Sequence, residues 1–154
     1  MYRMIRGVSF TADGHIGDIV HGVLEAIAAP RYYWHIVPSQ TEAMDSAFEN
    51  DLFENEYCDG TALLHSNFHD SIIVFLKLEA YETECPAKDL PTYVEFAESD
   101  CQILLLINDC KYAEMYVKSP EVLKKAESYL RKFPCSDILI ITDENDKRTK
   151  LDVL

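Results

Sequence analysis

Two strand-like runs flank a short polar interval in Cys101-Gln-Ile-Leu-Leu-Leu-Ile-Asn-Asp-Cys-Lys-Tyr-Ala-Glu-Met-Tyr-Val117. Residues 101–107 and 112–117 are rich in aliphatic and aromatic side chains, which favour β-strands. The interval 108–111 opens with Asn and Asp, which suit tight turns because their side chains bond the nearby backbone. The stretch therefore predicts a β-hairpin, and an antiparallel pair at this point argues against a wholly parallel sheet.

A second hairpin is expected further along, where strand-like residues 137–142 lead through an acidic turn to a last strand at 149–153. Upstream strands are expected at 6–10, 31–37 and 71–81, and the last of these is apolar on both faces, as a central strand is. Apolar periodicity and capping residues predict helices at 13–27, 59–68, 92–97 and 119–133, and Met44, Ala47 and Phe48 could form a further short helical face. The expected fold is α+β, a mixed or mainly antiparallel sheet with helices packed against it.

Length and composition indicate one globular domain over residues 1–154. The chain has 154 residues, of which 48% are hydrophobic and only 5 are Gly and 6 Pro. The longest apolar runs, 72–76 and 103–107, are far shorter than a bilayer span, and the N-terminus lacks the features of a secretory signal. Five cysteines without a C-x-x-C spacing favour reduced thiols. We therefore expect a cytoplasmic protein.

The charge is strongly negative and unevenly distributed. The net charge is −13, and residues 1–110 carry 5 Lys or Arg against 19 Asp or Glu, whereas residues 111–154 carry 9 against 8. Coulomb repulsion from such a surface disfavours nucleic acid and anionic membranes as partners. The charge is compatible with a basic protein surface as a partner. Solubility alone is the simpler explanation of the charge.

The acidic segment, residues 42–59, is the densest part of this charge. It contains seven acids and no Lys or Arg, with Phe48, Leu52, Phe53 and Tyr57 between them. Aromatic anchors inside a charged rim are typical of an interface, but they also pin an ordinary loop to its own core. If the segment is an interface, its candidate residues are Glu49, Asp51, Phe53, Glu54 and Glu56.

Two other constellations are candidate sites for a small ligand or metal. Asp143, Asn145, Asp146 and Arg148 form the most polar local run, and a turn explains these residues better than calcium binding, because the glycine and closing Glu of a calcium loop are missing. Arg148 could still anchor a carboxylate. His65 and His69 would share one face of a helix, as two metal ligands can, but no third ligand is evident.

No short motif for nucleophilic, nucleotide-binding or metal-dependent catalysis occurs in the sequence, so it supplies no evidence for an enzyme and names no cofactor. We carry two hypotheses. The first is a non-enzymatic interaction protein, immunity-like or regulatory, which presents residues 42–59 to a basic partner. The second is a small enzyme or ligand-binding domain with its site near Asp143–Arg148 or the pair His65/His69.

Several short motifs point to a family. They are Arg-Gly-Val-Ser-Phe at 6–10, Tyr-Tyr-Trp at 32–34, Ser99-Asp100-Cys101, and Ile-Thr-Asp-Glu-Asn-Asp-Lys-Arg-Thr at 141–149. With these motifs the chain resembles an uncharacterised family of small bacterial proteins, a domain of unknown function, over most of its length. The resemblance implies a bacterial cytoplasmic protein and carries no activity or catalytic residues to this sequence. It also draws attention to the turn at 143–148.

Overall fold

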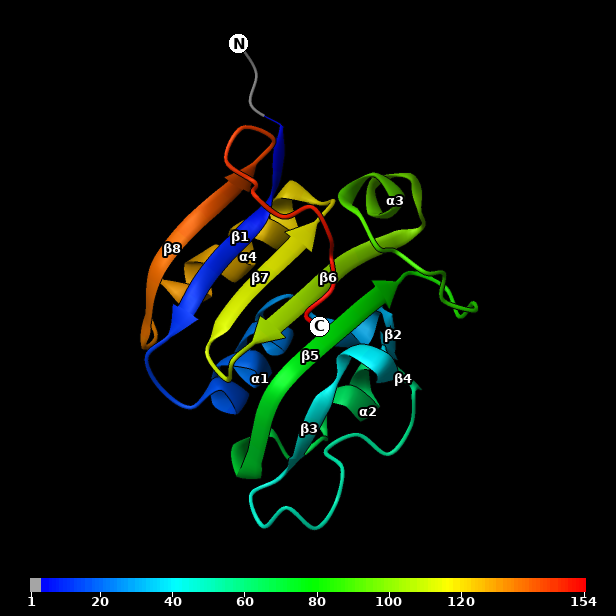
Figure 1. Ribbon diagram of the computed structural model, residues 1–154, viewed down its shortest axis with the longest axis vertical. Coiled ribbons are helices and arrows are strands. Elements are labelled where there is room, and N and C mark those ends of the chain that lie inside the picture. The colour runs from blue at the N-terminus through cyan, green and yellow to red at the C-terminus, as the bar shows by residue number, and fades with distance from the viewer. Residues whose placement is uncertain (1–3) are drawn as a thin grey trace.

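One antiparallel sheet organises the chain. The computed structural model describes residues 4–154, and its strands form an eight-stranded sheet in the order β4-β2-β5-β6-β7-β1-β8, with β3 paired to the other half of β5 (Figure 1). The strands are β1 (Ile5–Ala12), β2 (Tyr33–Ile36), β3 (Glu42–Asp45), β4 (Tyr57–Asp59), β5 (Ser71–Tyr81), β6 (Cys101–Asn108), β7 (Tyr112–Val117) and β8 (Cys135–Thr142). Every strand pair in the described range is antiparallel. The α+β expectation is confirmed.

The predicted hairpin is present as β6 and β7, with Leu105 opposite Met115. Asp109 and Cys110 in the turn between them have φ of 52° and 63°, a left-handed pair that matches the twist of the two strands. Cys101 is buried at the start of β6 and Cys110 is exposed in the turn at its end, so the two thiols do not face each other across this hairpin.

Two of the α-helices cover the back of the sheet. Within residues 4–154 the α-helices are α1 (Ile16–Ala26), α2 (Gly60–Leu64), α3 (Tyr93–Glu98) and α4 (Pro120–Leu130). Figure 1 shows α1 and α4 behind the strands, where Val20, Leu24 and Leu130 join the larger hydrophobic core. The helix α1 begins later than the capping signal at Asp13 predicted, because the His15 side chain accepts a hydrogen bond from the backbone N–H of Asp18. Ser119 caps α4 as expected.

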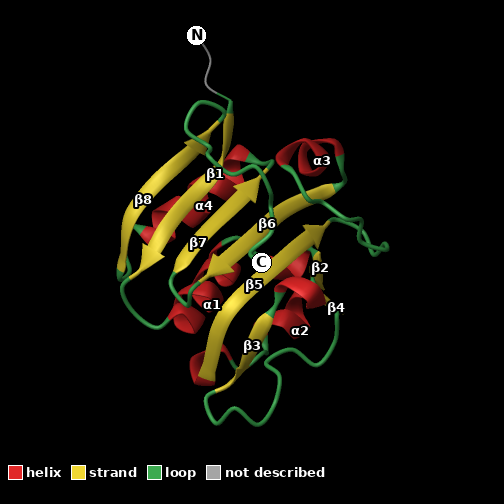
Figure 2. Cartoon of the chain, in the orientation of Figure 1, coloured by secondary structure: helices red, strands yellow, loops and turns green. Residues whose placement is uncertain are grey.

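The front of the sheet is covered by α3 and by the tail, residues 143–154, which crosses it as an extended strap (Figure 2). The last strand expected at 149–153 is therefore wrong. Leu151 and Val153 alternate as a strand would, but they alternate because both side chains pack into the front core. Gln40 Oε1 accepts the backbone N–H of Val153 at 2.7 Å, so side chains and loops hold the tail instead of a ladder.

The edge strand β8 has a side-chain partner where a ninth strand would pair. Asn145 Nδ2 donates to the carbonyl of Ile140 at 2.9 Å, and Asn145 Oδ1 accepts the N–H of Thr142 at 2.8 Å. An amide side chain that imitates a strand in this way protects an edge from pairing with other chains. Asn145 therefore has a structural role.

A buried charge fastens the tail to the middle of the sheet. Lys77 lies on the central strand β5 with its side chain 2% exposed, and its Nζ donates to Asp152 Oδ1 at 2.8 Å and to the carbonyl of Leu90 at 3.2 Å. A buried ammonium needs such partners because leaving water is costly.

The short helical face considered at 44–48 was also wrong. Residues 42–45 form the edge strand β3, and a turn follows in which Phe48 adopts φ 60°. Four residues of strand are too few to show a period in the sequence. None of the helices within residues 4–154 is long and apolar enough to cross a bilayer.

Candidate functional site

The acidic segment, residues 42–59, comprises β3, β4 and the loop 46–56 between them. The side chains of Glu49, Asp51, Glu54 and Glu56 are all exposed, and Phe53 is half-buried. At the tip, Asp45 accepts the backbone N–H groups of Glu49 and Asn50, and the bond from Glu49 is the main cause that lowers the pKa of this carboxyl. The turn leaves Phe48 with 69% of its surface exposed. An aromatic side chain is thus presented among acids.

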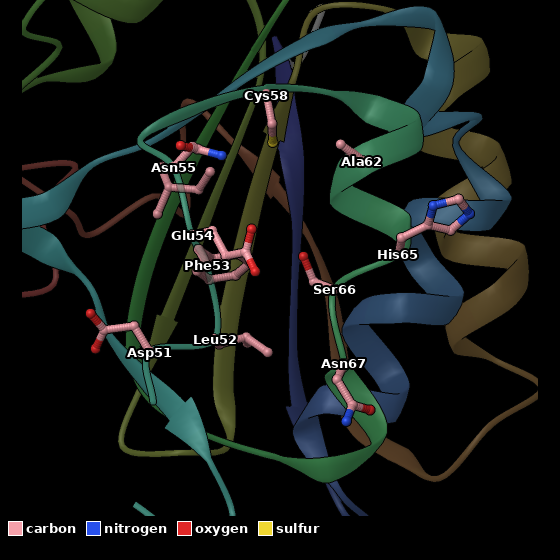
Figure 3. A pocket seen from close by; sticks show the side chains of 11 residues that line it. Asp51, Leu52, Phe53, Glu54, Asn55, Cys58, Ala62, His65, Ser66 and Asn67 are labelled. Carbon is pink, nitrogen blue, oxygen red and sulfur yellow. The ribbon is translucent and has the colours of Figure 1, made fainter. Parts of the chain in front are cut away.

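A cleft of about 450 Å³, the first cleft, lies between residues 51–55 and helix α2 (Figure 3). Its lining combines apolar side chains with polar ones: Ile36, Asp51, Leu52, Phe53, Glu54, Asn55, Cys58, Ala62, His65, Ser66 and Asn67. In Figure 3 the carboxylate of Glu54 and the hydroxyl of Ser66 point toward one another across the gap. The ring of His65 points away from the gap.

A second cleft of about 300 Å³ lies on the other side of the same segment. It shares Asp51, Phe53 and Glu54 with the first cleft. Its lining also includes residues of β3 and Glu56. Asp51 points away from the first cleft in Figure 3. Residues 51–56 are therefore a wall between two clefts, with carboxylates on both sides.

The wall is anchored to the core. Phe53 meets Phe68 edge to face with ring centroids 5.9 Å apart, and Leu52 packs against the larger core. The N–H of Leu52 donates to the carbonyl of Ala43 at 3.1 Å, and the N–H of Ile36 donates to the carbonyl of Glu56 at 2.8 Å. Phe53 therefore pins the segment to the core, whereas Phe48 is exposed at the tip of the loop.

A buried histidine stands at the end of this wall. His35 Nε2 lies 2.8 Å from Glu56 Oε1, and His35 Nδ1 lies 2.8 Å from Glu79 Oε1. Burial alone would lower the pKa of His35, but the hydrogen bonds with Glu79 and Glu56 outweigh it and the pKa is raised. The ring of Tyr57 stacks on His35 at 4.6 Å between centroids. The carboxylates of Glu79 and Glu56 thus stabilise a positive charge on the His35 ring.

The sequence did not single out this cluster. His35 follows Trp34 in a strand, and its direction could not be assigned from a short aromatic run. A usable signal was the charge inside β5, because Glu79 and Lys77 interrupt an otherwise apolar strand and charged residues are almost never fully buried unless paired.

Three charged residues of the turn 143–148, Asp143, Asp146 and Arg148, are engaged within the protein. Arg148 Nε donates to Glu114 at 2.6 Å, and Asp146 accepts from Tyr116 at 3.1 Å and pairs with Arg6 at 3.1 Å. Asp143 accepts from the backbone N–H of Met4 at 3.2 Å. A groove of about 580 Å³ runs beside the turn, lined by Arg148 and the exposed Leu139. These contacts hold the tail on the sheet.

His65 and His69 do not form the expected helical pair. Helix α2 ends at Leu64, His65 is its C-terminal cap, and His69 lies in a separate short turn, because the chain leaves the helix after one and a half turns. His69 instead meets α1, where it pairs with Asp18, and its hydrogen bond is the main cause that lowers the pKa of that carboxyl. Among residues 4–154 no three His, Cys, Asp or Glu side chains converge closely enough to hold a metal ion.

Two of the thiols, Cys58 and Cys101, are poorly suited to nucleophilic chemistry. Cys58 lines the first cleft, and burial raises its pKa to about 11. Burial likewise raises the pKa of Cys101 to about 12. A thiol with such a pKa carries almost no thiolate at neutral pH, which is the form that attacks.

Comparison with known proteins gives a family but no activity. A family model described as "Protein of unknown function (DUF2691)" matches residues 5–152. "Uncharacterized protein YncE" of Bacillus subtilis (strain 168) is 29% identical over 155 residues, which cover 97% of this chain and 100% of that protein. No solved structure matches the chain. The resemblance drawn from short motifs, to an uncharacterised bacterial family, is confirmed.

Proposed function

The chain belongs to this DUF2691 family of proteins of unknown function, and we propose that it is a non-enzymatic binding module that receives a basic segment of a partner protein along the two clefts. The observation that carries the proposal is the wall of residues 51–56, which is acidic on both sides and anchored from within. The partner would be a regulated protein, or one that this chain neutralises in an immunity-like manner.

Charge supports a basic partner. The acidic segment has seven acids and no Lys or Arg. The sheet order puts β3 and β4 at one side of the molecule and β8, from the nearly neutral last third of the chain, at the other. A one-sided charge of this kind steers an oppositely charged surface toward the acidic edge and speeds the encounter.

Cleft chemistry supports a Lys or Arg side chain as the group that is bound. Such a side chain has an apolar stem and a charged head. The first cleft offers Leu52 and Phe53 to a stem and the carboxylate of Glu54 to a head. A volume of about 450 Å³ is enough for more than one such side chain, and pockets of roughly 300–1,000 Å³ are usual for bound ligands.

The exposed Phe48 supports a protein partner over a free cation. With 69% of its surface exposed at the tip of the loop, Phe48 offers apolar area next to Glu49 and Asp51. Aromatic side chains at the centre of a charged rim contribute strongly to protein interfaces.

A labelled basic peptide tests the proposal. Binding of fluorescein-octalysine is followed by fluorescence anisotropy at low and moderate salt, with the wild type and the variant Asp51→Asn/Glu54→Gln. Exposed ion pairs contribute about 0.2–1 kcal/mol each, so the variant should bind roughly 2- to 30-fold more weakly. Affinity should also fall as salt rises.

The matched control removes two charges elsewhere. Glu98→Gln/Glu121→Gln changes two exposed acids on α3 and α4 and has the same net charge as the cleft variant. Its affinity should change by no more than about twofold, because the Debye length near physiological salt is only about 8 Å. Equal losses in both variants would show a general charge effect and would contradict the clefts as the binding site.

We also propose a cytoplasmic location. The cysteines at 58, 85, 101, 110 and 135 are all free thiols, as proteins in a reducing compartment have. Cell fractionation with an antibody to the protein tests this location, and recovery outside the cytoplasm would contradict it.

A small-ligand site beside the Asp143–Arg148 turn remains the alternative. Only the groove of about 580 Å³ favours it, since Arg148 and Asp146 are engaged within the protein. A thermal-shift screen with metabolites and divalent cations would detect such a site, and a ligand whose effect disappears in Arg148→Gln would establish it.

A further inference from the structure

The cluster of Glu56, His35 and Glu79 joins the wall to the interior of the sheet. The Glu79 side chain on β5 is 1% exposed, the His35 side chain on β2 is 10% exposed, and the Glu56 side chain on the wall is 48% exposed. The contacts thus run from the fully buried carboxylate of Glu79 through the imidazole of His35 to the carboxylate of Glu56, which is in contact with water.

The two hydrogen bonds of His35, to Glu79 and to Glu56, each need a proton. Carboxylates only accept, and a neutral imidazole has a single N–H, so it can donate to one carboxylate only. With both carboxylates ionised, the imidazolium form donates from both nitrogens and satisfies Glu79 and Glu56 together, which fits the two distances of 2.8 Å. The geometry is therefore that of the protonated cluster.

Loss of one proton breaks the bond to Glu56. A buried carboxylate without a donor costs more free energy than an exposed one, which water can solvate. The remaining N–H of His35 should therefore stay on Glu79, and Glu56 should be released. The charge of the three groups changes from −1 to −2 at the same time.

Among the described residues, the lining of the pocket around His35 holds no other cation to take over. The pocket that His35 shares with its neighbours is lined by Tyr33 from β2, Tyr57 and Asp59 from β4, Tyr81 from β5, and Glu84 and Cys85 from the loop after it, together with Trp34 and Cys58. Lys77 on β5 is occupied by Asp152. Asp59 and Glu84 are further acids in this lining.

The released carboxylate belongs to the proposed binding site, because Glu56 lines the second cleft. A cationic side chain in that cleft would compete with the imidazolium for Glu56. We infer that binding of a basic partner at the second cleft is linked to release of a proton from the Glu56–His35–Glu79 cluster. This inference rests on the proposed function and adds a pH dependence to it.

The sign of the linkage follows directly. The form with fewer protons binds better, so affinity for a basic partner should rise with pH through the range in which the cluster titrates. A single linked proton allows a rise of up to about tenfold per pH unit. The raised pKa of His35, caused by its two carboxylate partners against the opposing effect of burial, places this range above the usual value for histidine.

Octalysine titrations test the linkage. Affinity is measured by isothermal titration calorimetry from about pH 6 to pH 9, where lysine keeps its charge, in buffers with different heats of ionisation. The expected result is tighter binding at higher pH with release of a proton into the buffer. The NMR signals of His35, followed in the free and octalysine-bound protein, should show a lower pKa in the complex.

Two variants separate the cluster from other histidines. Glu56→Gln removes the exposed partner and should flatten the pH dependence of binding. His69→Gln removes a histidine that lines neither cleft and pairs with Asp18 on α1, and it should keep the wild-type dependence. The NMR spectrum of Glu56→Gln confirms that the variant is folded.

The outcomes are distinguishable. Binding with no proton release, or a pH dependence that is equal in the wild type and Glu56→Gln, would overturn the inference while leaving the binding module in place. Absence of octalysine binding at every pH would overturn the proposed function itself.

Discussion

The buried ion pair between Lys77 and Asp152 should respond very differently to loss of its two partners. Asp152→Ala removes the carboxylate and leaves an ammonium that is 2% exposed without a counter-ion. Lys77→Met removes the charge from the core and leaves Asp152, which is 24% exposed, to be solvated. The two single substitutions remove the same contact, so any difference between them measures the cost of an unpaired buried charge.

The magnitudes follow from burial. Removing one partner of a buried pair costs about 3–5 kcal/mol, and we take about 3 kcal/mol because Asp152 is partly solvated. Methionine has a similar length and fills the same space, so Lys77→Met should lose only about 1 kcal/mol, for the lost donor to the carbonyl of Leu90. For a domain of this size about 1 kcal/mol corresponds to about 2–4 °C in Tm, which predicts a fall of about 6–12 °C for Asp152→Ala and about 2–4 °C for Lys77→Met.

Urea denaturation and calorimetry of both single variants and of the double variant are the assay. The double variant should be as stable as Lys77→Met, because once the lysine is gone the carboxylate has no role, which gives a coupling of about 3 kcal/mol. The reasoning fails if Lys77→Met is the more destabilising change, or if the losses of the two single variants simply add in the double variant.

Two further predictions concern His35 and Asn145. Because the pKa of His35 is raised in the folded protein by its carboxylate partners against the effect of burial, its stabilisation is complete below about pH 6.5 and is lost as pH rises through the folded value; the difference in urea stability between wild type and His35→Gln should therefore shrink from about pH 6 to pH 9, and a constant difference would contradict the bridged geometry. Asn145→Ala removes two hydrogen bonds to β8, so it should cost about 1–2 kcal/mol and expose the strand edge; light scattering after size exclusion should show self-association that the wild type lacks.

Elements with strong local signals were predictable from the sequence. Residues 71–81 are apolar on both faces, and the structure places them as β5, bonded to strands on both sides. The β6–β7 hairpin was predictable because Asn108 and Asp109 suit a tight turn between two apolar runs. The helix α4 was predictable because Ser119 and Pro120 mark its start.

Two errors share a physical cause. Residues 149–153 alternate apolar and polar side chains, and this period is the same for a strand in a ladder as for a strap that lies on a sheet face. Residues 42–45 show the converse, a strand of four residues that lies on an acidic edge and needs few apolar side chains. A local sequence pattern indicates which side chains are buried, but it does not indicate which groups the backbone forms hydrogen bonds with.

The candidate site was half predictable. Charge density pointed to Glu49, Asp51, Glu54 and Glu56, because composition is a property of the sequence. The clefts and the His35 cluster were not, because Glu56, His35 and Glu79 come from three separate parts of the chain and meet only when β2 pairs with both β4 and β5.

The position of β1 has a consequence for the order of folding. This first strand lies between β7 and β8, with Gly7 opposite both Tyr116 and Ile141. Both neighbours, β7 and β8, lie far from β1 in the sequence. The strand therefore has no partner until the chain has closed two long loops. Each closure has an entropic cost that no contact has yet offset. We expect β5, β6 and β7 to assemble first and β1 to join late, which makes this half of the sheet the slow, committing step of folding.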